Sequence, residues 1–135
     1  MANTTTASAT WTDDGRFLTI ASSGHAMVVD AGEKKSAPGP MELVLIGLCS
    51  CTAVDVVTIL RKKREPLTSL EVAAEAERAP EPPRVFTHIK LLYRVAGGVS
   101  RKAAEDAVRL SKETYCSVSA MLQKTVKIDA RVELV

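Results

Sequence analysis

The stretch GPMELVLIGLCSCTAVDVVTILRKKR, residues 39–64, decides the fold of this chain. Pro40 suits the first turn of a helix, and Pro66 ends any helix that begins there. Between residues 43 and 60 the only charged side chain is that of Asp55. The sequence therefore predicts one long helix, from Met41 to about Lys63, that is apolar on every side.

A helix of this length and composition also meets the requirement for a membrane span. Three features oppose that alternative. A carboxylate within the hydrocarbon costs about 2.5 kcal/mol or more, small and polar residues gather at positions 47–52, and the flanking strands need partners on one side. We expect no membrane association. Because one sheet cannot cover so apolar a helix in a small domain, we expect a second copy to cover the rest, in a homodimer.

The size and charge of the chain narrow the classes of protein to which it can belong. Its 135 residues predict a single domain over residues 1–135, with residues 1–10 as a polar, mobile arm. A formal charge of +2 and one short basic run, at 61–64, give no reason to expect nucleic acid as a partner. Three cysteines and a start without a secretory signal predict a cytoplasmic protein without a disulfide framework.

Alternating and helical patterns locate the other elements. Two short strands are expected at 16–23 and 25–31, separated by a turn signal at Ser23-Gly24. Strands are also expected at 69–78, 85–95 and 125–135, because apolar and polar residues alternate there. Ser100 is the expected N-cap of a helix over 101–114, and a short helical segment is expected at 115–124. The sequence predicts an α+β fold, an antiparallel sheet with a long central helix and a second helix on one side.

The three cysteines are candidate reactive residues. Cys49 and Cys51 lie one residue apart on the long helix, so their side chains diverge by about 200° and cannot share one partner. Only two histidines, His25 and His88, are present, and we expect no metal site and no cofactor. Cys116 lies between two helical segments, where free backbone N–H groups stabilise a thiolate. The spacing alone leaves open whether Cys51 and Cys116 meet.

Three segments, GPMELVLIGLCSCTAVDVVTILRKKR, RVFTHI and ETYCSVSAML, together resemble the OsmC/Ohr family, and its YhfA-like branch in particular, over residues 24–135. The resemblance implies the OsmC-like fold in an intertwined homodimer whose long helices pack at the interface. It also implies a thiol peroxidase that reduces small organic hydroperoxides.

The resemblance assigns roles to four residues. Cys51 corresponds to the peroxidatic cysteine and Cys116 to the resolving one, and an external dithiol reduces their disulfide. The family's acid, which holds a cation near the first thiol, corresponds to Glu42, although the matching place is Met41, one residue earlier. Arg16 is the only arginine before the long helix and so corresponds to the cation. Ser117 follows the second cysteine, where the family often has proline.

Two other functions are compatible with the residues. One is a non-catalytic OsmC-like module that binds a small apolar ligand at the dimer interface, with the cysteines as packing residues. The other is a hydrolase that uses Cys51 with His88, for which no orienting partner is recognisable. The peroxidase requires Cys51 and Cys116 to lie within disulfide-forming distance and a cation to lie near Cys51.

Overall fold

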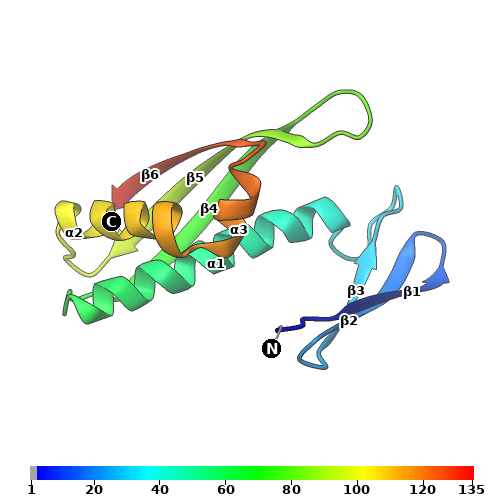
Figure 1. The fold of residues 1–135 in the computed structure, drawn as a ribbon, viewed down its shortest axis with the longest axis horizontal. Coiled ribbons are helices and arrows are strands. Elements are labelled where there is room, and N and C mark those ends of the chain that lie inside the picture. Colours follow the sequence, from blue (N-terminus) through cyan, green and yellow to red (C-terminus); the bar gives the residue numbers. More distant parts are fainter. Residues whose placement is uncertain (1–2) are drawn as a thin grey trace. The chain divides into compact units, whose positions relative to one another are not determined.

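The structure, a computed structural model, describes residues 3–135. Its elements are β1 (Ala7–Asp13), β2 (Arg16–Ala21), β3 (Ala26–Asp30), α1 (Pro40–Lys62), β4 (Ser69–Arg78), β5 (Phe86–Ala96), α2 (Arg101–Leu110), the π-helical turn η1 (Ser111–Tyr115), α3 (Ser117–Leu122) and β6 (Lys127–Leu134) (Figure 1). The chain forms two compact units, one that ends at Val44 and one that extends from Leu45 to Val135. The predicted α+β class is confirmed, with two three-stranded sheets and one long helix.

The first unit contains the antiparallel sheet β1-β2-β3. Residues 7–10, which the sequence predicts as part of a mobile arm, instead pair with β2 from Ala7↔Ala21 to Thr10↔Leu18. Every residue of β1 is exposed, and the apolar residues that alternate with polar ones in its sequence, ASATWTD, are mostly small alanines, which make a weak strand signal. Apolar side chains of the sheet are exposed as well. Met27 and Val28 are neighbours on β3 and point to opposite faces, yet each is 44% exposed.

The second unit contains a sheet in the order β4-β5-β6. β4 and β5 are antiparallel, and β5 buries the predicted residues Ile89, Leu91, Tyr93 and Val95. β5 and β6, however, are parallel, which corrects the predicted all-antiparallel sheet. The helical segments α2, η1 and α3 lie between these two strands in the chain. Such a helical crossover is long enough to bring the next strand back in the same direction.

Helix α1 begins and ends within one residue of its predicted bounds. Its buried residues, Leu48, Thr52, Val56 and Leu60, recur every four positions and so form one stripe along the helix. Outside that stripe, Ile46 and Val54 are 54% and 64% exposed. Within residues 3–135, α1 is the one helix long and apolar enough to cross a membrane, a test that core helices of soluble proteins also pass.

Candidate functional site

The fold of the second unit brings Cys51 and Cys116 together. Cys51 lies half-buried on α1, and Cys116 is buried at the residue that precedes α3. The two thiols lie close enough to interact, since Cys51 helps to raise the pKa of Cys116, and neither is in a disulfide. The fold thus brings two cysteines that are distant in the sequence into the same neighbourhood.

The backbone around Cys116 holds its thiol in a defined place. Its N–H donates to the Ser111 carbonyl oxygen at 2.8 Å, the five-residue hydrogen bond that closes η1. Its sulfur accepts from the Ser119 N–H at 3.3 Å and so caps the first turn of α3. The hydroxyl of Ser119 is buried and has no hydrogen-bond partner among the described residues.

The acidity of Cys116 differs from the sequence expectation. Burial, opposed by the Ser119 N–H and reinforced by the neighbouring Cys51, raises the pKa of Cys116 to about 11. The predicted backbone N–H is present, but desolvation of the thiolate outweighs it. Cys116 is therefore a protonated thiol at neutral pH, not the stabilised thiolate that its position between two helices suggested.

A chain of buried hydroxyl groups lies beside the two thiols. Thr52 Oγ1, next to Cys51 in the sequence, is 2.7 Å from Tyr93 OH and 2.7 Å from Ser111 Oγ. The Ser111 hydroxyl in turn donates to Asp55 Oδ2 at 2.8 Å. Burial raises the pKa of Tyr93 to about 12, so its hydroxyl remains a donor.

Sequence analysis missed Thr52 and Ser111 as parts of this site. Thr52 falls on the four-residue repeat of buried α1 positions, which was the one signal available for it. Ser111 lies in a helical stretch where the sequence gives no sign of a π turn.

Cys49 is set apart from the pair. It is half-buried, and burial raises the pKa of its thiol. Within residues 3–135, no group of three or more histidine, cysteine or acidic residues is arranged to hold a metal ion.

Arg16, the predicted cation, lies in the first unit at the start of β2. Its Nε donates to Asp13 Oδ1 at 3.0 Å, and its guanidinium is 3.3 Å from Asp14 Oδ2. The hydrogen bond with Asp13 raises the pKa of Arg16 and lowers that of Asp13. In this structure, two aspartates of its own β-turn hold the guanidinium.

Glu42, the predicted acid, lies in the first turn of α1, also within the first unit. Its carboxylate accepts from the Gly39 N–H at 3.0 Å and from Lys35 Nζ at 3.0 Å. This is the backward hydrogen bond of a capping box, and both contacts lower the pKa of Glu42. Among the ion pairs of the described residues, Glu42 is paired with Lys35 and not with Arg16.

His88 does not lie with the thiols. It alternates on β5 with the buried residues that face α1, so it belongs to the opposite face of the sheet. There its Nε2 is 2.7 Å from Asp129 Oδ2. His88 thus has an orienting carboxylate, but on the wrong side of the sheet for a hydrolase based on Cys51.

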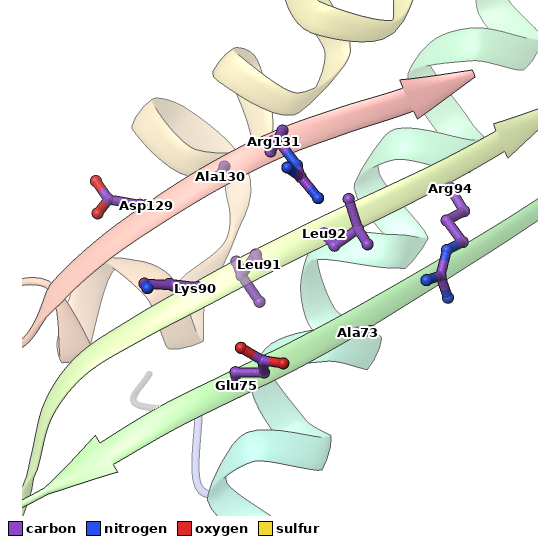
Figure 2. Close-up of a pocket in the computed structure, with 9 residues that line it drawn as sticks. All are labelled: Ala73, Glu75, Lys90, Leu91, Leu92, Arg94, Asp129, Ala130 and Arg131. Carbon is purple, nitrogen blue, oxygen red and sulfur yellow. The ribbon is translucent and has the colours of Figure 1, made fainter.

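Charged side chains dominate that outer face of the second sheet. A hollow of about 510 Å³ lies there. Figure 2 shows the side chains from all three strands that line it. Its lining residues include Glu75, Lys90, Arg94, Asp129 and Arg131 and contain no cysteine. This charged surface therefore offers no group for thiol chemistry, and the thiol pair is the candidate functional site.

Comparisons with known proteins agree on one family. The family model of OsmC-like proteins matches residues 32–131. The protein YhfA of Escherichia coli K12 is 44% identical over 126 residues, which cover 93% of this chain and 94% of YhfA. A crystal structure of a protein from Aquifex aeolicus superimposes with a TM-score of 0.91 at 30% identity, over 99% of this chain and 98% of that one.

A more distant structure shares the fold. The organic hydroperoxide resistance protein OsmC of Legionella pneumophila has a TM-score of 0.75 at 19% identity, over 98% of each chain. With the family model and the YhfA identity, these matches identify the chain. It belongs to the OsmC-like protein family.

Proposed function

We propose that this protein is a thiol-dependent peroxidase that reduces organic hydroperoxides through Cys51 and Cys116. The observation that supports it most is the proximity of the free thiols of Cys51 and Cys116 in the second unit. Membership of a family that includes an organic hydroperoxide resistance protein supports the substrate class. Such a peroxidase serves in defence against oxidative stress, and we expect it to act in the cytoplasm.

The two thiols take different parts in the reaction. The Cys51 thiolate attacks the distal peroxide oxygen, a sulfur–oxygen bond forms, the O–O bond breaks, and the alkoxide leaves as the alcohol after it gains a proton. Cys116 then attacks the sulfenic acid on Cys51, which gives the disulfide and water. An external dithiol reduces the disulfide through a mixed disulfide.

The environments of the thiols support this order. Cys51 is half-exposed on α1, whereas Cys116 is 2% exposed and has its pKa raised to about 11. A buried, protonated thiol is a poor first nucleophile, because the thiolate is the reactive form. It is suited to wait for a sulfenic acid that forms next to it.

The proposal also includes a cation that activates the Cys51 thiol. The family resemblance assigns this role to Arg16, with Glu42 as the supporting acid. Lys35, which forms an ion pair with Glu42, is the alternative cation against which Arg16 is tested. If Arg16 is the activating cation, Arg16→Ala slows the reaction of Cys51 with peroxide and Lys35→Ala does not. The reverse result assigns the role to Lys35.

We also propose an intertwined homodimer. Helix α1 buries one stripe of residues. Only 22% of the apolar 18-residue segment of this helix is buried within a single chain. In the first unit, Trp11 is 66% exposed, and Leu18, Ile20, Met27 and Val28 are between 40% and 44% exposed. So much unpaired apolar surface is typical of an obligate interface. Sedimentation equilibrium at micromolar concentration should give twice the chain mass, and a monomer would rule out this assembly.

The decisive experiment measures consumption of cumene hydroperoxide with dithiothreitol as the reductant. Cys51→Ser should abolish turnover, and Cys49→Ser, the matched control on the same helix, should keep the wild-type rate. Cys116→Ser should accumulate a sulfenic acid on Cys51 that dimedone traps and mass spectrometry detects. Equal rates for the wild type, Cys51→Ser and Cys116→Ser would instead favour a non-catalytic module that binds a small apolar ligand.

A further inference from the structure

We propose that the buried hydrogen bond between Thr52 and Ser111 positions the Cys116 thiol against Cys51, so that the disulfide closes quickly and in one place. These are positioning residues, since they contact no substrate. The consequence for peroxide turnover rests on the proposed function, whereas the geometry of the thiol pair does not.

The protons of the hydroxyl chain have one consistent direction. The Ser111 hydroxyl donates its single hydrogen to Asp55, so its oxygen must accept from Thr52. Thr52 has then used its own hydrogen, and its oxygen must accept from Tyr93. The chain runs from Tyr93 through Thr52 and Ser111 to the Asp55 carboxylate. A chain polarised in this way resists rearrangement more than its separate hydrogen bonds do.

Each end of the Thr52–Ser111 bond is one step from a reactive cysteine. Thr52 follows Cys51 directly on α1. The carbonyl oxygen of Ser111 accepts the Cys116 N–H at 2.8 Å, and this is the hydrogen bond that makes the turn a π turn. The hydroxyl contact at 2.7 Å therefore links the backbone that holds one thiol to the backbone that holds the other.

The bond is protected from water and from competing partners. Thr52 is 1% exposed, Ser111 is 0% exposed and Tyr93 is 1% exposed. Loss of either hydroxyl leaves the other buried without its partner, which favours movement of η1 away from α1. π turns are rare and recur at functional sites. The Thr52 hydroxyl holds Ser111, the residue on which this turn closes, and so sets the position of Cys116.

Equilibration in a glutathione redox buffer measures this positioning without any peroxide. Two protein thiols and one oxidised glutathione give the intramolecular disulfide and two reduced glutathione molecules. The equilibrium constant is the effective concentration of Cys116 at Cys51. Thr52→Val keeps the side-chain shape and removes the hydroxyl, and we expect it to lower this constant about tenfold.

Two variants separate positioning from general damage to the fold. Thr52→Ser keeps the hydroxyl and should stay within about twofold of the wild type. Thr58→Val makes the same replacement at an exposed position of α1, outside the chain, and should leave the constant unchanged. If Thr52→Val does not fold, two variants of Ser111 give the same test. Ser111→Ala should lower the glutathione equilibrium constant, and Ser111→Thr, which keeps the hydroxyl, should restore it.

A second measurement tests the consequence for the reaction. After a single pulse of cumene hydroperoxide, Thr52→Val should give more dimedone adduct on Cys51 than the wild type, because the sulfenic acid waits longer for Cys116. If Thr52→Val has a normal circular dichroism spectrum and the same glutathione equilibrium constant as the wild type, the positioning role is overturned. A tenfold loss in a protein that consumes no peroxide keeps the positioning role and rejects the peroxidase.

Discussion

The buried Cys116 thiol should react slowly with a small alkylating reagent in the folded protein. Iodoacetamide attacks the thiolate, so its rate follows the fraction of Cys116 that is ionised. The structure raises the pKa of Cys116 from 9.0 to about 11. The side chain is also hidden, at 2% exposure for the residue, so access and ionisation act in the same direction.

The size of the effect follows from these values. A rise of two pKa units lowers the thiolate fraction at neutral pH about 100-fold. A thiolate of higher pKa is intrinsically more nucleophilic, and this compensates for about tenfold. Ionisation alone should therefore slow Cys116 about tenfold relative to the same residue in urea, and burial should slow it further.

The assay uses short iodoacetamide pulses on the reduced wild-type protein, with initial rates for each cysteine-containing peptide measured by mass spectrometry. Cys51 should be labelled before Cys116 in the folded protein, and the Cys116 rate should still rise steeply with pH above 9, since ionisation is far from complete there. Labelling of Cys116 in the folded protein as fast as in urea would refute a buried resolving thiol.

Four further substitutions test the structure through urea unfolding. Gly97→Ala places a Cβ 2.1 Å from the Pro66 carbonyl oxygen at a φ of +117°, so it should lower the free energy of unfolding by about 3 kcal/mol. Gly98→Ala, whose Cβ has its nearest atom at 4.0 Å, should lower it by about 1 kcal/mol. Equal losses in the two variants would contradict the clash at Gly97. Hydrogen bonds from Ser36 and Gly32 lower the pKa of Asp30 from 3.8 to about 2. Its contribution to stability is thus present above pH 3.8 and lost as the pH falls towards 2, and Asp30→Asn should remove this part of the acid sensitivity. Ser100→Ala deletes the 3.1 Å cap to the Ala103 N–H and should lower the free energy of unfolding by about 1 kcal/mol, while an unchanged midpoint would show that the cap is dispensable.

Local signals were sufficient for most of the elements. Pro40 and Pro66 bracket an uninterrupted apolar run, so the bounds of α1 followed from the chain itself. On β5, alternation identified the buried side before the structure did, because each residue's face depends only on its own position in the strand. β1 was missed although Ala7, Ala9 and Trp11 alternate with polar residues, because small alanines give a weak apolar signal in a strand that buries none of its residues.

Other features depended on the packing of distant segments. The parallel pairing of β5 with β6 needs the whole length of α2, η1 and α3, which no short window contains. The π turn differs from an α-helix by the acceptor of one backbone hydrogen bond, and Ser111 stays in it with its hydroxyl bonded to residues of α1.

The sequence by itself determined where the long helix and most of the strands lie, that the chain resembles the OsmC/Ohr family, and that the long helix is too apolar for one sheet to cover. Only the tertiary structure decided that Cys51 and Cys116 are neighbours, that burial keeps Cys116 protonated, and that a hydroxyl chain connects their backbones. The physical reason is that propensity and periodicity act along a few residues. Desolvation and hydrogen bonding at a buried site instead depend on which surfaces the folded chain presses together.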